Sequence, residues 1–397
     1  MLRKITLSIA ILAGMASLAD AQVYIDRFGN ACNENEADVP EYTLPDPLAK
    51  KCGRKITTVK AWEKKRPSVL GIFEDEMYGH APGRPEGLHF ELACPDELIY
   101  DGKVLRRSVR ICIDDNPEHS FVALIHLPAD ASAEHPVPMF EGINLFEDAL
   151  TPGSPHSYRW PVEYICGEGF GLATVFHSSI EKDVDFTKVA GGVRDWYGPE
   201  YDWGAIAAWA WGLSRVLDYL ETCPEIDATR VAVIGHSRGG KTALWAGATD
   251  SRFAMVCSNC SGCCGAAISR RVFGENFKSI SQVFPYWFTP NFYKYADNEN
   301  AFPADQHWLA ALIAPRPLYI GSAIEDLWAD PRGEWLTAVN AGPVYELYGK
   351  QGVSGREPEL DVPDAEGTVA YRVRTGIHSL LTSDWYDYMD FAKKHLK

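Results

Sequence analysis

The sequence predicts a three-layer αβα sandwich with a mostly parallel central sheet. Segments with the apolar pattern of strands alternate with segments of helical spacing, as in other α/β proteins. The four apolar residues 231–234 suit a strand that is buried on both faces of a parallel sheet. A helical pattern follows at 241–247, so this stretch has the order strand, turn and helix. These observations together predict the fold class.

The elements of the sandwich are expected in a definite order. Residues 107–113 and 120–127 alternate or cluster apolar side chains like the first strands of a sheet. Residues 204–220 carry apolar side chains at helical spacing, and residues 384–396 have the pattern of an amphipathic terminal helix. Further apolar runs, expected as strands, lie at 136–145, 171–177, 253–256, 317–320 and, more weakly, 344–347.

Residues 1–21 have the layout of a secretory signal peptide. A short basic start, an apolar run at 5–18 and the sequence Ala-Asp-Ala at 19–21 predict cleavage before Gln22. The apolar run is too short to span a bilayer comfortably, and no later segment is apolar enough to do so. We therefore expect an exported protein, secreted or periplasmic, with no membrane partner.

Residues 22–397 are predicted to form a single catalytic domain with long insertions. Residues 22–65 are rich in Pro, Asp, Glu and Asn, which favours an irregular wrap, and a Cys32–Cys52 disulfide could hold it. Mixed loop and strand is expected at 66–110, so the irregular N-terminal extension covers about 22–110. Residues 184–202 form a polar, glycine-rich insertion.

The charge and the cysteine content restrict the partners and the redox chemistry. A net charge of −16 argues against nucleic acid or an anionic membrane as a partner. Ten cysteines in an exported chain permit disulfides, and Cys94 with Cys112 is one candidate pair. The chain is expected to be a monomer.

Residues 235–239 read Gly-His-Ser-Arg-Gly, a complete G-x-S-x-G motif. Between a strand and a helix, such a turn holds the serine in a strained conformation with its hydroxyl exposed. A Cβ at either glycine would crowd the turn. The context therefore favours Ser237 as a nucleophile over a chance match to the motif.

A serine hydroxyl needs a positioned base, and in this arrangement serine, acid and histidine follow one another along the chain. The base should lie after the last strand, where His378 stands just ahead of the terminal helix. His395 lies within that helix, and His307 precedes the strand at 317–320, so both are poorly placed. The acid is expected after 317–320. There Asp326 is preferred because a short carboxylate at the end of the strand can reach the imidazole, with Glu325 and Asp330 as alternatives.

Four cysteines form the pattern C-x-x-C-x-x-C-C at 257–264. A zinc site usually takes four ligands from two separated pairs, which this pattern does not supply. Buried or disulfide-bonded cysteines are therefore expected here, with no metal and no cofactor.

With these residues in view, the chain resembles the glucuronoyl esterases, carbohydrate esterase family 15, over roughly residues 115–395. Residues 235–241, Gly-His-Ser-Arg-Gly-Gly-Lys, are similar to the family motif G-[CH]-S-R-x-G-K, and residues 307–317 and 374–378 also look like family segments. The resemblance implies an α/β-hydrolase fold and hydrolysis, without a metal, of the ester between the 4-O-methylglucuronate of glucuronoxylan and lignin alcohols.

The resemblance also implies roles for individual residues. Ser237 would be the nucleophile and His378 the base, and Arg238 would help to stabilise the oxyanion together with backbone N–H groups. The residues implied to contact the sugar are Lys241, Glu275 and Trp328.

Two positions depart from the family pattern. Many members carry Glu-Ser-Gly after the strand that follows the nucleophile helix, where this chain has Cys260-Ser261-Gly262. A thiol cannot replace a carboxylate there at neutral pH. Some bacterial members carry the acid after the next strand instead, which strengthens the choice of Asp326. His236 replaces a cysteine of the fungal members, which removes one family disulfide.

Two other functions remain open from the sequence. One is an esterase for acetyl or feruloyl groups on xylan; a peptidase is less favoured. The other is a catalytically impaired polysaccharide-binding protein, which only the missing glutamate supports. The intact set of Ser237, Asp326 and His378 argues against it.

Overall fold

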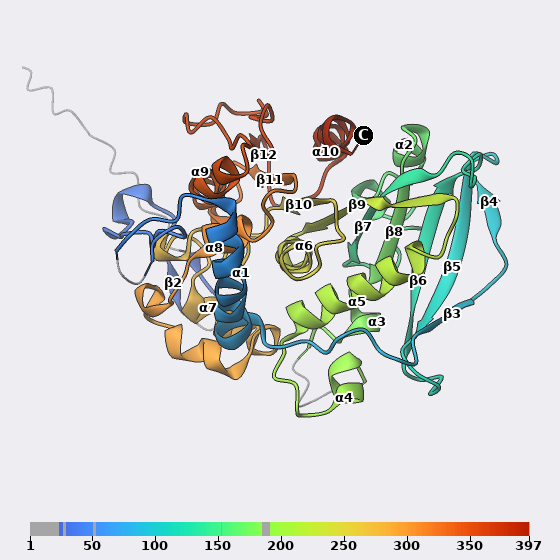
Figure 1. Ribbon diagram of the computed structural model, residues 1–397, viewed down its shortest axis with the longest axis horizontal. Coiled ribbons are helices and arrows are strands. Elements are labelled where there is room, and N and C mark those ends of the chain that lie inside the picture. Colours follow the sequence, from blue (N-terminus) through green and yellow to red (C-terminus); the bar gives the residue numbers. More distant parts are fainter. Residues whose placement is uncertain (1–23, 27–28, 51–52, 152, 185–190, 397) are drawn as a thin grey trace, which may run out of the picture.

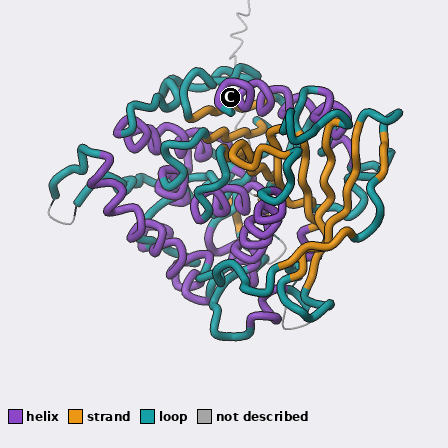
Figure 2. The backbone as a smooth tube through the Cα atoms, turned by 45° about the vertical axis from the view of Figure 1, so that its right-hand side comes forward, coloured by secondary structure: helices purple, strands orange, loops and turns teal. Residues whose placement is uncertain are grey.

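A ten-stranded sheet forms the centre of the molecule (Figure 1). The computed structural model describes residues 24–26, 29–50, 53–151, 153–184 and 191–396. The strand order is β12-β11-β10-β9-β7-β8-β6-β5-β3, and β4 also pairs with β5. The six strands from β12 to β8 run parallel, whereas β6, β5, β3 and β4 pair antiparallel. Figure 2 shows these strands side by side in one twisted sheet.

The strands are short at the N-terminus and longer within the central sheet. A separate two-stranded sheet pairs β1 with β2. The strands are β1 Tyr24–Ile25, β2 Ala31–Cys32, β3 His89–Leu92, β4 Glu97–Ile99, β5 Val104–Cys112, β6 Ser120–Pro128, β7 Val137–Asn144, β8 Gly171–Phe176, β9 Ile226–His236, β10 Met255–Asn259, β11 Leu318–Ala323 and β12 Val369–Arg374.

Ten α-helices are present in the described part of the chain, with short 3-10 and π segments between them. The α-helices are α1 Val59–Phe73, α2 Val162–Gly167, α3 His177–Ile180, α4 Val193–Tyr197, α5 Ala205–Leu220, α6 Arg238–Thr249, α7 Phe277–Val283, α8 Gln306–Ala311, α9 Pro331–Leu347 and α10 Thr382–His395. None of the helices among the described residues is both long and apolar enough to cross a bilayer.

The helices bury one apolar core on each face of the sheet. Helices α2 and α10 cover one face, and the larger core on the other face lies under α1, α5, α6, α8 and α9 (Figure 1). Helix α5 is buried along its whole length, which follows from its almost uninterrupted apolar sequence. The architecture is thus the predicted three-layer αβα sandwich.

Four loops lie side by side at the carboxyl ends of the parallel strands. Strands β9, β10, β11 and β12 are neighbours and run in the same direction. Their carboxyl ends therefore lie side by side, and the loops that follow them are the natural place for a site. Those loops carry Ser237, Cys260, Asp326 and His378.

The structure corrects three sequence-based expectations. Residues 344–347 are the last turn of α9 rather than a strand, and the final strand is β12. The stretch 66–110, expected as loop and strand, begins inside α1. Cys94 and Cys112 do not pair: Cys112 lies opposite His89 at one end of the β3–β5 pair, whereas Cys94 follows β3 at the other end. The leader and Cys52 lie outside the described residues.

Candidate active site

Ser237 stands at a sharp turn between β9 and α6. Its backbone dihedral angles are φ 60° and ψ −126°, a conformation that is strained for a non-glycine residue. A Cβ at Gly235 would lie only 1.9 Å from the carbonyl oxygen of Gly239, so the turn can close only with glycine there. The N–H of Ser237 donates to the carbonyl of Asn259 at 2.9 Å, which ties the turn to β10.

The structure brings His378 and Asp326 together. Nδ1 of His378 lies 2.5 Å from Oδ2 of Asp326, and the Asp326 side chain is 4% exposed. Of the two alternative acids, Glu325 points into solvent. Asp330 is committed elsewhere, because it accepts from Nε of Arg271 at 2.8 Å and caps the start of α9.

Neither of the other two histidines considered from the sequence belongs to this group. His307 is buried under the N-terminal segment, where its Nε2 lies 2.8 Å from the carbonyl of Pro45. His395 lies in α10 with its ring against Phe391.

Ser237 and His378 line one cleft with a volume of about 220 Å³. Its polar lining includes Arg238, Lys241 and Glu275, and its apolar lining comes from aromatic rings. The three rings are Phe284, Trp287 and Trp328. All four residues implied to assist catalysis or to contact sugar, namely Arg238, Lys241, Glu275 and Trp328, therefore share the cleft with Ser237.

The guanidinium of Arg238 is held from two sides. It forms an ion pair with Asp183, and it lies over the ring of Trp287, 5.0 Å from the centroid. Asp183 also accepts from Nε1 of Trp287 at 2.8 Å and contacts Nε2 of His177 at 3.3 Å. Burial tends to raise the pKa of Asp183, but the His177 contact and the Arg238 charge prevail and lower it below its usual value.

Lys241 and Glu275 form a buried pair on the floor of the cleft. Nζ of Lys241 lies 3.6 Å from Oε2 of Glu275 and donates to the carbonyl of Ser261 at 2.5 Å. Both side chains are about one-twentieth exposed. Burial raises the pKa of Glu275, and the Lys241 charge offsets only part of that effect. Polar groups at this depth need partners, and a ligand with hydroxyl groups would supply more of them.

Cys260 lies where many members of the resembled family carry a glutamate, and it is buried beside Asp326. Its backbone has φ 43°, and its N–H donates to the carbonyl of Gly321 at 2.7 Å. Burial, reinforced by the nearby Glu334 and Asp326, raises the pKa of its thiol well above the usual value. Cys260 therefore carries no charge that could orient an imidazolium.

His236 packs behind His378, with ring centroids 4.4 Å apart. Its Nδ1 lies 2.7 Å from Oδ1 of Asn259. The amide of Asn259 is fixed in turn, because its Nδ2 donates to the hydroxyl of Tyr388 at 2.7 Å. Burial lowers the pKa of His236 well below its usual value, and the electrostatic effect of the neighbouring His378 acts in the same direction. A neutral ring thus supports the exposed histidine from behind.

Sequence reasoning did not single out three residues of the cleft. Asp183 lies one position before the insertion that begins at 184, and nothing local marks it. Phe284 and Trp287 stack face to face, with centroids 3.8 Å apart and an interplanar angle of 3°. They belong to the aromatic run Val-Phe-Pro-Tyr-Trp-Phe at 283–288, and this concentration of rings was the available signal.

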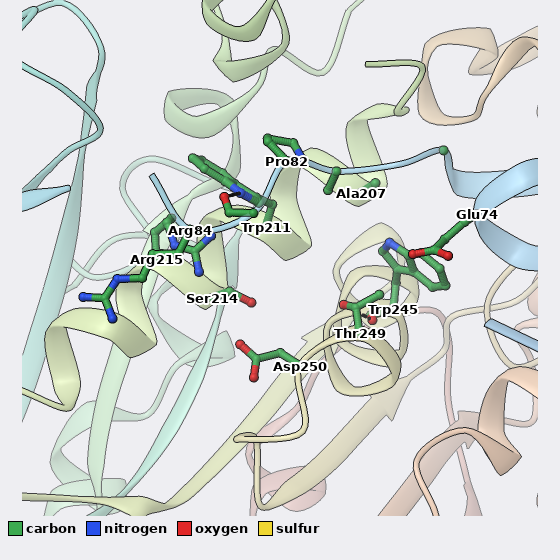
Figure 3. Close-up of a pocket in the computed structure, with 13 residues that line it drawn as sticks. Glu74, Pro82, Arg84, Ala207, Trp211, Ser214, Arg215, Trp245, Thr249 and Asp250 are labelled. Carbon is green, nitrogen blue, oxygen red and sulfur yellow. Dashed lines mark hydrogen bonds between the residues drawn. The ribbon is translucent and has the colours of Figure 1, made fainter. Parts of the chain in front are cut away.

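A second hollow lies between α5, α6 and the 79–84 segment (Figure 3). It is lined by polar groups such as Arg84, Ser214 and Asp250 beside the edges of Trp211 and Trp245. Asp250 follows the far end of α6, about 20 Å from Ser237 by helical rise. The residues that line this hollow include no histidine, so it offers no imidazole base to a serine.

A serine at a strained strand-to-helix turn, with a histidine–carboxylate pair on the neighbouring loops, defines a serine hydrolase of the α/β-hydrolase fold. A family model described as "Glucuronyl esterase, fungi" matches residues 113–349. The carbohydrate esterase MZ0003, from an unknown prokaryotic organism, is 39% identical over 100% of this chain and 99% of that protein. A 4-O-methyl-glucuronoyl methylesterase of Podospora anserina is 28% identical over 80% of this chain and 60% of its own length.

Solved structures agree with these relatives. A glucuronoyl esterase from Solibacter usitatus superposes with a TM-score of 0.84 at 42% identity, over 90% of this chain and 99% of that one. A promiscuous esterase of carbohydrate esterase family 15 from a marine bacterial metagenome gives 0.83 at 39% identity, over 92% and 100%. The chain belongs to the glucuronoyl esterase family, carbohydrate esterase family 15, and is a carboxylic ester hydrolase.

Proposed function

We propose that this esterase cleaves the ester between the 4-O-methylglucuronate of glucuronoxylan and a lignin alcohol. The observation that carries the proposal is the buried Lys241–Glu275 pair, which lies in the same cleft as Ser237. A pyranose presents hydroxyl groups to such a pair, and its C–H faces suit aromatic rings such as Trp328 and Trp287. An acetyl group alone would leave these buried polar groups without a ligand.

The reaction begins at Ser237. His378 takes the proton of the serine hydroxyl as the oxygen attacks the uronate carbonyl, and Asp326 keeps the imidazole in the required tautomer and orientation. The 2.5 Å contact between His378 and Asp326 supports this assignment of the acid. The strained backbone of Ser237 keeps its side chain presented to the cleft.

Negative charge develops on the carbonyl oxygen during the attack. The N–H of Arg238 is the first of α6, so it has no partner within the helix and can donate to that oxygen. The guanidinium of Arg238 adds a positive charge on the same side of the cleft. Groups fixed before the reaction stabilise such charge most strongly, which is the role we assign to the anchoring of Arg238 by Asp183.

The collapse of this intermediate releases the alcohol and leaves an acyl-enzyme. His378 returns its proton to the leaving alcohol, then takes one from a water molecule that attacks the acyl group. The second intermediate releases the uronic acid and restores Ser237. Each of these steps is assigned to side chains and backbone groups of the chain itself.

The place of action follows from the N-terminus and the substrate. Residues 1–21 carry the pattern of a secretory leader, and a plant cell-wall polymer lies outside the cell. We propose that residues 22–397 act as one exported, monomeric catalytic domain.

The test is hydrolysis of benzyl and methyl glucuronate esters by the wild type and by Ser237→Ala. We expect cleavage of both esters, with loss of activity in the variant. Acetylated xylose and a feruloylated sugar serve as comparison substrates on the same enzyme. Equal kcat/KM on acetylated sugar and on the uronate ester would contradict the proposal and favour an acetyl esterase. A folded wild type that binds glucuronoxylan without cleaving any ester would indicate a binding protein.

A further inference from the structure

The thiol of Cys260 lies against the histidine–carboxylate pair, although no catalytic step uses it. Its Sγ, a ring nitrogen of His378 and a carboxylate oxygen of Asp326 all lie within 4.8 Å of one another. Cys260 is buried, and it is one of the residues that line the cleft of Ser237. The side chain of His378 is 39% exposed, so solvent reaches its imidazole ring.

These three groups form a donor set with a definite preference. Thiolate and imidazole together select zinc-like ions, whereas Mg²⁺ and Ca²⁺ prefer sites made of oxygen atoms. Zinc–ligand distances of ~2.0–2.3 Å place the donor atoms of a tetrahedral site about 3.3–3.8 Å apart. The Sγ atom therefore has to approach the other two by about 1.5 Å at most, and the His378–Asp326 contact has to widen by about 1 Å. Arg374 donates to the carbonyls of Ile377 and Ser379 on either side of His378, so the imidazole has to make this shift by side-chain rotation.

We propose that Cys260, Asp326 and His378 bind a thiophilic divalent cation, Zn²⁺ or Cd²⁺, and that this binding stops ester hydrolysis. The cation exchanges water molecules for the three protein ligands, and the thiol releases its proton to solvent as the sulfur–metal bond forms. If Nδ1 of His378 is the ligand, the ring proton moves to Nε2, which then cannot accept the proton of Ser237. If Nε2 is the ligand, it is blocked directly. Either geometry removes the base from the reaction.

One other group of metal-binding side chains occurs among the described residues, namely His89, Glu91 and Cys112. It lies on the β3–β5 strand pair, at the opposite end of the sheet from β12. Binding there would leave the cleft untouched. Cys112 is therefore a matched control for Cys260, since both are buried cysteines within a three-residue cluster.

The first experiment measures ester hydrolysis at increasing Zn²⁺, Cd²⁺, Mg²⁺ and Ca²⁺. We expect inhibition by Zn²⁺ and Cd²⁺, reversal by a chelator, and no effect of Mg²⁺ or Ca²⁺. In Cys260→Ser the half-inhibitory concentration should rise at least about tenfold, since even indirect partners of a metal ligand are worth 10–100-fold in affinity. Each variant is compared with its own rate in metal-free buffer. Cys112→Ser should be inhibited like the wild type.

A second variant and a direct binding measurement complete the test. Cys260→Gly also removes the thiol and suits the positive φ of this position, so it should fold even if the serine variant does not. The ultraviolet absorption of a Cd²⁺–thiolate bond, titrated in Ser237→Ala, reports binding without turnover. We expect one equivalent of this signal to be lost in Ser237→Ala/Cys260→Gly.

The possible outcomes test the metal site independently of the proposed esterase function. Inhibition of both Cys260 variants at the wild-type concentration would overturn the site, as would a wild type that Zn²⁺ and Cd²⁺ leave fully active. A Cys260-dependent Cd²⁺ signal in a protein that cleaves no uronate ester would uphold the site while the proposed function fails.

Discussion

Asp183 forms an ion pair with Arg238, the residue that directly follows Ser237. The two residues are 55 positions apart, and the carboxylate comes from the segment just after α3. Asp183 is itself fixed by Nε1 of Trp287 and by the hydroxyl of Tyr286. The orientation of the Arg238 guanidinium is therefore set by a network that reaches the aromatic wall of the cleft.

Replacement of Asp183 by Asn should weaken catalysis through Arg238. The amide keeps the shape of the side chain but removes the charge that holds the guanidinium. We expect kcat to fall about tenfold, which corresponds to about 1.4 kcal/mol of transition-state stabilisation, with a smaller change in KM. Steady-state kinetics on benzyl glucuronate measure this effect. Asp195→Asn, an exposed carboxylate in the neighbouring insertion, is the control and should behave like the wild type.

Replacement of Asp326 by Asn should nearly abolish turnover while the fold is kept. An amide in place of the acid of a serine triad holds the histidine in the wrong tautomer, which lowers kcat by about 10⁴-fold. Glu325→Gln changes the adjacent exposed carboxylate and should leave kcat unchanged. Near-normal turnover in Asp326→Asn, with normal thermal unfolding, would move the acid to another residue.

Parts of this site could be predicted from the sequence because they depend on local chain geometry. The turn at Ser237 needs only a strand, two glycines and a helix. Asp326 and His378 could be placed together because each follows a strand of the parallel half of the sheet. Asp183 could not be found in this way, since its position depends on how a loop folds across the cleft.

Two helices lie where the sequence analysis expected other structure, namely α1 and the last turn of α9. Val344 and Leu347 are spaced by one helical turn, but in a short apolar run that spacing cannot be told from a buried strand. Helix α1 contains Pro67 within a strongly charged sequence, a pattern that disfavours a helix interior. The structure accommodates this proline within α1 and caps the helix with the side chain of Thr58.

Replacement of Gly235 by Ala should prevent the nucleophile turn from closing. The added Cβ would meet the Gly239 carbonyl at 1.9 Å, and backbone atoms there cannot move without disturbing α6. We expect a loss of several kcal/mol in the free energy of unfolding, on the order of 3 kcal/mol or more, or no folded protein at all. Chemical denaturation measures the change.

The matched control is Gly71→Ala in α1, where an added Cβ meets nothing within 4 Å. Alanine replaces glycine favourably within a helix, so this variant should gain up to about 1 kcal/mol. An equal loss of stability in both variants would contradict the steric account of the Gly235 turn.

Glu334 should make the protein less stable as the pH rises. Its carboxyl is fully buried, accepts from the N–H groups of Ser261 and Gly262, and has a pKa raised to about 7 by burial. Below pH 4.5 the carboxyl is protonated in both the folded and the unfolded chain. Between pH 4.5 and about 7 only the folded chain keeps the proton, so stability falls with rising pH.

The measurement is the free energy of unfolding of Glu334→Gln against pH, relative to the wild type. The variant has no carboxyl to ionise, so the difference should move in favour of the variant by about 3 kcal/mol between pH 4 and 8. Glu346→Gln, exposed on the same helix, should show no such trend. A constant difference for Glu334→Gln across this range would show that its carboxyl titrates normally.

The segment at 29–45 also determines how safely the protein can be trimmed or tagged. The carbonyl of Asn33 accepts from the N–H of Gly274, and Glu36 pairs with Arg271, so this segment braces the loop that carries Glu275. Proteolysis or a bulky N-terminal fusion that displaced these residues would release the Glu275 loop, whereas the turn at Ser237 has its own contacts with β10. If Glu275 contacts the sugar as proposed, we expect a preparation clipped there to cleave small esters and to lose its selectivity for uronates, which makes the integrity of the N-terminus a quality criterion for every kinetic comparison.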